Sequence, residues 1–142
     1  MRCEEIMKRQ VQRSGEEETL QRAAEKMALS NIGILPVCDQ GGKVLGIITD
    51  RDITIRAVAK SKAGDTRVGE VMTRAVVSCR DSDDLAVAEQ RMIQHRVSRI
   101  IIEDDQGLLS GIISLSDIAE REPGRRAAIV LREVSSREAP RS

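Results

Sequence analysis

Two short stretches of the sequence place a hydroxyl residue three positions before an aspartate, directly after an apolar run. They are GIITDRDI, with Thr49 and Asp52, and GIISLSDI, with Ser114 and Asp117. Where a helix begins at the hydroxyl residue, its hydroxyl and the free N–H groups of the first turn can bind a phosphate. The aspartate can accept two hydrogen bonds from a ribose diol, as carboxylates do in dinucleotide sites. The pattern therefore predicts a nucleotide site at each stretch.

The same pattern also has a purely structural explanation. A Thr or Ser followed by Asp at a helix N-terminus is often only a cap, worth about 1 kcal/mol. Because both stretches keep the spacing, we favour nucleotide binding, which is compatible with capping. Arg51 would add a cation near the phosphate in the first stretch, whereas Ser116 stands at that position in the second.

The two stretches belong to an internal repeat. They begin at Gly46 and Gly111, and the same offset of 65 residues relates many other positions. The matched pairs include Met7 and Met72, Val11 and Val76, Leu20 and Leu85, Ala23 and Ala88, Met27 and Met92, and Asp39 and Asp104. The chain thus holds two copies of one unit, at about residues 5–59 and 70–121. Neither copy alone is large enough to bury a good core, so we expect the two to pack together.

Each copy is predicted to fold as β-α-β-β-α. A short extended piece, VQR or VVS, precedes a helix near residues 18–30 or 83–95 that has apolar residues at helical spacing. Two strands follow, joined by the glycine-bearing connections DQGGK and DQG. A second helix then starts near Asp50 or Leu115.

The polar segment 61–67 contains Gly64 and marks the junction between the copies. We therefore predict a first motif at residues 1–62, a second at 63–122 and a C-terminal tail at 123–142. In the tail, apolar residues flanked by arginines predict a short amphipathic helix at about 125–135.

The tandem unit, with G-h-h-[TS]-x-x-D at the exit of its second hairpin, resembles the CBS domain. The resemblance rests on both octapeptides, on the helix openings EETLQRAAEKM and SDDLAVAEQRM, and on IGILPV before the first hairpin. It covers about residues 2–121 and is similar to stand-alone bacterial CBS-pair proteins, including the mycobacterial hypoxic-response type. It implies an α/β fold in which two βαββα motifs pack as a pseudo-twofold pair, called a Bateman module, with two clefts between them.

The resemblance also implies how each cleft is built. Ribose and phosphate residues come from one copy, while the other copy supplies its first short strand and the start of its second. The first cleft would hold Thr49, Arg51, Asp52, Val76, Val77, Ser78, Ser98, Arg99 and Ile100. The second would hold Ser114, Ser116, Asp117, Val11, Gln12, Arg13, Gly33, Ile34 and Leu35. The apolar members would sandwich adenine, and Arg99, which replaces the aliphatic Ile34, is open as a phosphate ligand or a solvated strand residue.

In this family the clefts bind adenosine-containing ligands, so the resemblance implies AMP, ADP or ATP, with S-adenosylmethionine as a further candidate and no metal required. We expect a non-catalytic regulatory module, because the sequence offers no Ser/His/Asp arrangement, metal cluster or P-loop. The alternative is a structural or protein-interaction module with empty clefts. The sequence names no effector protein.

The composition of the chain limits which other classes of partner, such as nucleic acid or membranes, are expected. The chain has no Phe, Tyr or Trp, which rules out an aromatic platform for stacking nucleic-acid bases. Its 23 basic and 23 acidic residues cancel, so neither nucleic acid nor an anionic membrane is an expected partner. No apolar run approaches the ~20 residues of a membrane span. The first residues, MRCEEIMKRQ, do not resemble a signal peptide, and we expect a cytoplasmic protein.

The three cysteines, Cys3, Cys38 and Cys79, are too few and too scattered for a disulfide framework. With His95 as the single histidine, they give no zinc-like spacing. A Cys–His nucleophile stays open, but small, partly buried, reduced thiols are the expectation. His95 itself is expected to complement the dipole at a helix C-terminus.

The helix expected over residues 50–60 has apolar residues on more than one face, namely Ile53, Ile55, Ala57, Val58 and Ala59. A surplus apolar face suggests burial against another subunit, and we predict a homodimer.

Overall fold

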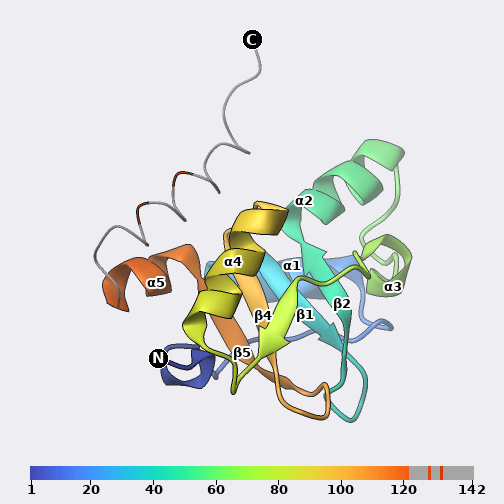
Figure 1. Ribbon diagram of the computed structural model, residues 1–142. Helices are drawn as coiled ribbons and strands as arrows, with labels where there is room; N and C mark the ends of the chain where they lie inside the picture. The colour runs from blue at the N-terminus through green and yellow to red at the C-terminus, as the bar shows by residue number, and fades with distance from the viewer. Residues whose placement is uncertain (122–127, 129–131, 133–142) are drawn as a thin grey trace. The chain divides into compact units, whose positions relative to one another are not determined.

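The computed structural model describes residues 1–121 together with Ala128 and Arg132. The tail helix expected at 125–135 falls outside the described residues, apart from those two positions. The chain, drawn in Figure 1, is divided into two compact units that are described separately below. The Asp52 unit consists of Val11–Val76 with Gly107–Leu109, and the Asp117 unit consists of Met1–Gln10, Val77–Gln106 and the described residues from Ser110 onward.

The Asp52 unit has the following elements in chain order: α1 (Leu20–Ser30), β1 (Ile34–Cys38), β2 (Val44–Thr49), α2 (Asp50–Asp52), the π-helical η2 (Ile53–Ala57), the 3-10 turn η3 (Val58–Lys60) and α3 (Val68–Val71). β1 and β2 pair antiparallel, with Ile34 opposite Thr49 and Leu35 opposite Ile48. The second helix expected from Asp50 is thus present, but its middle turn is widened to a π-helix.

The Asp117 unit contains η1 (Cys3–Glu5), β3 (Ser78–Arg80), α4 (Leu85–His95), β4 (Arg99–Glu103), β5 (Leu109–Ser114) and α5 (Leu115–Arg121), except that Leu109, the first residue of β5, belongs to the Asp52 unit. Its strands follow the order β3-β4-β5, and β3 runs parallel to β4 with Ser78 opposite Ile101. The predicted β-α-β-β-α order is confirmed for the second copy, the first copy has the same order without its first strand, and the mixed fold class is confirmed.

Local signals explain where the two long helices begin and end. The Thr19 hydroxyl caps α1 by accepting the Arg22 N–H at 3.1 Å, and the Asp84 carboxylate caps α4 by accepting the Ala86 N–H at 2.9 Å. The residues that follow the helices, Asn31 and Arg96, have left-handed φ values of 51° and 53°, which stops each helix.

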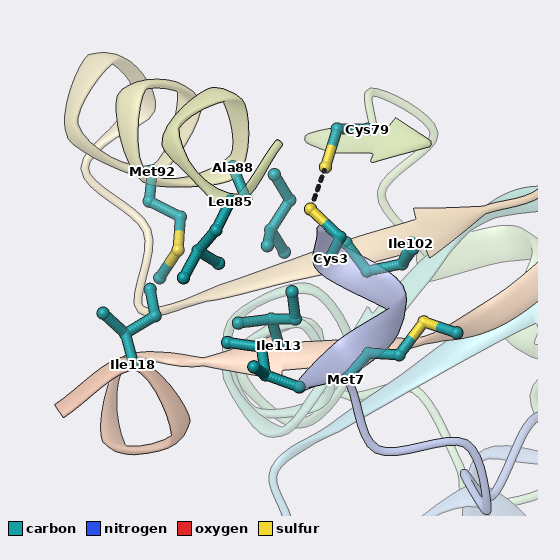
Figure 2. Close-up of a cluster of buried hydrophobic side chains, with 11 residues drawn as sticks. Cys3, Met7, Cys79, Leu85, Ala88, Met92, Ile102, Ile113 and Ile118 are labelled. Carbon is teal, nitrogen blue, oxygen red and sulfur yellow. Dashed lines mark hydrogen bonds between the residues drawn. The ribbon is translucent and has the colours of Figure 1, made fainter. Parts of the chain in front are cut away.

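Each unit has its own aliphatic core under its long helix. The core of the Asp52 unit contains Leu20, Ala23, Met27, Leu35, Val37, Ile48, Ala57, Val68, Val71 and Met72. The core of the Asp117 unit contains Cys3, Ile6, Met7, Cys79, Leu85, Ala88, Met92, Ile100, Ile102, Ile113 and Ile118 (Figure 2). Methionine and cysteine fill the space that aromatic side chains occupy in other proteins.

The first extended piece differs between the copies. In the second copy it forms β3, and the Ile101 N–H donates to the Val77 carbonyl at 3.2 Å. In the first copy the expected strand VQR is absent, and only Ser14 bridges Val37. The position equivalent to Ile101 is Pro36, which has no N–H to donate and so ends the ladder.

Each unit receives its outer edge from the segment in front of the other repeat. Thr73 exchanges two backbone hydrogen bonds of 2.9 Å with Ile47 of β2, and Lys8 exchanges bonds of 2.9 and 3.0 Å with Ile112 of β5. The compact units therefore divide the chain differently from the sequence repeat.

The glycine that opens each octapeptide makes this edge pairing sterically feasible. A Cβ on Gly111 would lie 2.5 Å from the Lys8 carbonyl oxygen, and one on Gly46 would clash with the Thr73 carbonyl. Only glycine lets the edge segment pass this close to β2 and β5.

Among the described residues, no helix has the length and apolar character needed to cross a membrane.

Candidate ligand-binding site

The Asp52 carboxylate lies where β2 passes into α2. The Asp52 N–H donates to Thr49 Oγ1 at 3.0 Å, and the Thr49 N–H donates to Asp52 Oδ2 at 3.1 Å. The Thr73 hydroxyl donates to the same carboxylate, 3.1 Å from Oδ1 and 3.2 Å from Oδ2. Arg56 Nε lies 3.7 Å from Oδ1. Asp52 is only 8% exposed, and these donors replace the water that its carboxylate has lost.

The Asp117 carboxylate has the same local geometry where β5 passes into α5. The Asp117 N–H donates to Ser114 Oγ at 3.2 Å, and the Ser114 N–H donates to Asp117 Oδ2 at 2.9 Å. Lys8 Nζ lies 3.6 Å from Oδ1, and Asp117 is 7% exposed. Ser116 Oγ lies 2.9 Å from Ser114 Oγ, so the second copy forms a pair of hydroxyls beside its carboxylate.

Both octapeptides therefore form reciprocal caps in which one carboxylate oxygen binds the N–H of the hydroxyl residue. The structural explanation of the pattern is thus present in both copies. The second oxygen, Oδ1, faces Thr73 and Arg56 in one unit and Lys8 in the other.

Three neighbours of the carboxylates were missed by the sequence reasoning, namely Thr73, Lys8 and Arg56. Thr73 and Lys8 occupy equivalent positions in the 65-residue repeat, each one residue after a matched methionine. The offset could have paired them with each other, but nothing in the sequence links them to the octapeptide of the opposite repeat. Arg56 follows Asp52 by four positions, and that helical spacing was an available signal.

The structure places other predicted residues beside the octapeptide of their own repeat. Ile34 pairs with Thr49, and the Asp50 N–H donates to the Gly33 carbonyl at 2.9 Å. At the equivalent place in the second repeat, the Leu115 N–H donates to the Ser98 carbonyl at 2.9 Å. In each copy, the start of the first hairpin strand (β1 or β4) therefore lies beside the end of the second (β2 or β5).

The residues expected across each cleft fall largely in the other unit. Of those expected opposite Asp52, Val76 belongs to the Asp52 unit, and the remainder, Val77, Ser78, Ser98, Arg99 and Ile100, belong to the Asp117 unit. Those expected opposite Asp117, namely Val11, Gln12, Arg13, Gly33, Ile34 and Leu35, all belong to the Asp52 unit.

Burial limits what some of these residues can offer. Leu35 and Ile100 are fully buried in the cores of their own units, so their side chains are not available to a ligand. Arg13, Arg51 and Arg99 are exposed, as side chains that approach a phosphate must be.

Comparison with known proteins identifies the architecture. The sequence model described as "CBS domain" matches residues 3–58 and 68–124, in tandem. The chain belongs to the CBS domain family. The match confirms the resemblance inferred from the octapeptides.

Other CBS proteins share both sequence and fold with this pair. The "CBS domain-containing protein YhcV" of Bacillus subtilis is 37% identical over 124 residues, which are 87% of each chain. The structure of Hypoxic Response Protein I with two coordinated zinc ions is 31% identical, with a TM-score of 0.79 over 87% of this chain and 100% of that one. The CBS pair of protein MJ0100, solved with 5-methylthioadenosine and S-adenosyl-L-methionine, is 27% identical, with a TM-score of 0.76 over 87% of this chain and 97% of that one.

Larger CBS-containing proteins match only in part. Inosine-5'-monophosphate dehydrogenase of Methanocaldococcus jannaschii is 34% identical over 128 residues, which are 25% of its length. The zinc ions belong to Hypoxic Response Protein I. Within the part of the present chain that the structure describes, no three His, Cys, Asp or Glu side chains are grouped to hold a metal ion.

Proposed function

We propose that this CBS pair is a non-catalytic regulatory module that binds an adenosine-containing ligand through residues of both motifs. The observation that carries the proposal is the pair of equivalent, nearly buried carboxylates, each at a helix start beside a hydroxyl. The MJ0100 pair, 27% identical and complexed with two adenosine derivatives, supports the ligand class. We propose AMP, ADP or ATP, with S-adenosylmethionine as a further candidate, and a cytoplasmic protein.

The proposed roles follow from the geometry of each carboxylate. One carboxylate oxygen of Asp52 or Asp117 is engaged in the helix cap, so the ribose diol would bind Oδ1 and displace the contacts made there by Thr73 and Arg56 or by Lys8. Thr49, or Ser114 with Ser116, would meet the phosphate together with the N–H groups of the first helical turn. Adenine would lie against Val76 and Val77 in one site and Val11 and Ile34 in the other.

The two sites differ in charge. Arg51 and Arg99 would assist phosphate in the Asp52 site, and Arg13 in the Asp117 site, so we propose that the Asp52 site binds phosphorylated adenosines more tightly. Charge-assisted hydrogen bonds contribute about 1.5–3 kcal/mol each in favourable burial. Lys8 adds a cation beside Asp117 and should narrow the difference. The Lys8→Met substitution should then widen the gap between the two affinities.

A thermal-shift screen followed by calorimetry tests the proposal. A ligand at about 100 times its Kd adds about 2.7 kcal/mol to the free energy of unfolding. In calorimetry with AMP and ATP, Asp52→Ala should remove the tighter class of site and Asp117→Ala the weaker. Asp65→Ala, which changes an exposed aspartate outside both octapeptides, is the matched control. Loss of the tight site in Asp117→Ala alone would reverse the assignment.

The second candidate function is a protein-interaction module with empty clefts. Val58 is 67% exposed and Leu29 is 83% exposed, and both could contact a partner. If the wild-type protein binds no adenosine ligand at millimolar concentration, the nucleotide proposal is wrong and the interaction module takes its place.

A further inference from the structure

Two cysteines distant in sequence meet inside the Asp117 unit. The sulfur atoms of Cys3 and Cys79 lie 3.6 Å apart (Figure 2). Cys3 is fully buried and Cys79 is 3% exposed, within the cluster that also holds Met7 and Leu85. None of the three cysteines is in a disulfide in the structure, and Cys38, which was expected to be partly buried, is buried in the other unit.

Backbone hydrogen bonds on both sides hold this pair in place. The Cys3 N–H donates to the Asp83 carbonyl at 2.9 Å, and the Leu85 N–H donates to the Met1 carbonyl at 2.7 Å. Cys79 lies in the middle of β3, opposite Ile102 of β4. A disulfide has an S–S length of about 2.05 Å, so the two sulfurs need to approach by only about 1.5 Å.

The contact also shifts the pKa values of the two thiols in opposite directions. The hydrogen bond between the two thiols lowers the pKa of Cys3, although burial opposes this. The same hydrogen bond, together with burial, raises the pKa of Cys79. Cys3 is therefore the sulfur that ionises first, and Cys79 keeps its proton. The thiol that ionises is the one that reacts with an oxidant, and a second thiol in contact with it can resolve the first oxidation product into a disulfide.

We propose that Cys3 and Cys79 form an oxidation site at which a peroxide converts the dithiol into an intramolecular disulfide. The Cys3 thiolate attacks one peroxide oxygen, the O–O bond breaks, and Cys3 becomes a sulfenic acid with release of hydroxide. Cys79 then attacks the Cys3 sulfur, the S–O bond breaks, and water leaves as the S–S bond forms. Two electrons pass from the two sulfurs to the peroxide. The thiol proton of Cys79 leaves in that water, and the hydroxide of the first step takes up the proton that Cys3 lost when it ionised.

The disulfide would fasten the N-terminal segment to β3. Residues Met1–Gln10 join this unit through η1 and through the pairing of Lys8 with Ile112. The cross-link closes a long loop, which restricts the unfolded chain more than the folded one and raises Tm. Because Lys8 lies five residues after Cys3, the disulfide would also restrict the movement of Lys8, whose ammonium group lies beside Asp117.

The test uses the full-length protein and hydrogen peroxide. We expect the intact mass to fall by two hydrogen atoms, peptide mapping under non-reducing conditions to find Cys3 joined to Cys79, and Tm to rise until a reductant restores both values. Cys38→Ser is the matched control and should behave as wild type. Cys3→Ser and Cys79→Ser should show neither the mass loss nor the rise in Tm.

Peptide mapping of the wild type needs no variant and so stands even if a serine substitution prevents folding. The proposal is overturned if peroxide leaves all three thiols free, if it adds oxygen to Cys3 without a cross-link, or if mapping finds Cys38 in the disulfide. None of these outcomes depends on nucleotide binding, so the site is tested separately from the proposed function.

Discussion

Thr73 and Lys8 give the two site carboxylates different neighbours at equivalent positions of the repeat. The Thr73 hydroxyl is a neutral donor whose bonds reach both oxygens of Asp52, whereas Lys8 places a positive charge near Asp117. The Lys8 side chain is 74% exposed, so solvent screens its attraction for Asp117. The hydroxyl should therefore matter more for folding, and the lysine more for the charge of the ligand that is accepted.

In Thr73→Val, both hydrogen bonds to Asp52 disappear while the side-chain volume is kept. The buried carboxylate then loses one of its donors, and we expect the free energy of unfolding to fall by about 1–2 kcal/mol. Urea denaturation measures the change. Thr54→Val is the control, because its exposed hydroxyl donates to the Asp50 carbonyl, at 2.9 Å, rather than to Asp52. Equal losses in the two variants would contradict the role given to Thr73.

Glu18 and Lys26 form an ion pair of 2.6 Å beside α1, and the Gly15 N–H also donates to the Glu18 carboxylate, at 2.6 Å. Burial acts to raise the pKa of Glu18, but these hydrogen bonds outweigh it and hold the pKa below its ordinary value of 4.5. A lowered folded-state pKa stabilises the protein above the unfolded value, and this stability is lost as pH falls through the folded value.

We therefore expect the free energy of unfolding to fall below about pH 4.5 through Glu18, and Lys26→Met to reduce that dependence. Urea denaturation across the acidic range measures both effects. Lys62→Met is the control, because its pair with Glu70 is exposed and 3.9 Å long. An unchanged acid dependence in Lys26→Met would show that the pair does not set the Glu18 pKa.

At the scale of elements, the edge segments depend on the glycines that open the octapeptides. In Gly46→Ala the new methyl group collides with the Thr73 carbonyl and with Met72. We expect a loss of about 1–3 kcal/mol, as for other overpacked positions, and displacement of Thr73 from Asp52. Gly64→Ala is the control, since its methyl group would meet Gln21 at an ordinary 3.6 Å. Urea denaturation measures the loss. If Gly46→Ala has the same free energy of unfolding as the wild type, this steric argument is wrong.

The elements that the sequence predicted are those with local signals. The helices α1 and α4 have apolar residues at helical spacing and capping residues at their ends, and the hairpins have glycine-bearing turns. The strand expected at VQR was wrong, because the missing N–H of Pro36 acts across the sheet rather than along the chain. The contacts of Asp52 with Thr73 and of Asp117 with Lys8 could not be predicted either, because they too join segments that are far apart in the chain. Backbone pairing between distant segments leaves no periodic pattern in the sequence.

At the scale of the whole molecule, the helical segment from Asp50 to Lys60 leaves Ile55 43% exposed and Val58 67% exposed. We predict a homodimer that buries these side chains. Light scattering at micromolar concentration should give twice the mass of the chain, and Val58→Lys should lower that mass. Leu29→Lys, at an exposed position of α1, is the control. A monomeric mass for the wild type would refute the prediction.

The edges supplied from in front of the opposite repeat also bear on the history of the gene. The front segment of each repeat lies against the octapeptide glycine of the other repeat, so a polypeptide with a single copy would complete its sheet by exchanging this segment with a second identical chain. The ancestral product would then have been an obligate swapped dimer. Duplication and fusion of its gene would have replaced a concentration-dependent association with an intramolecular one. After that step the two copies could diverge separately, as Thr73 and Lys8 have done.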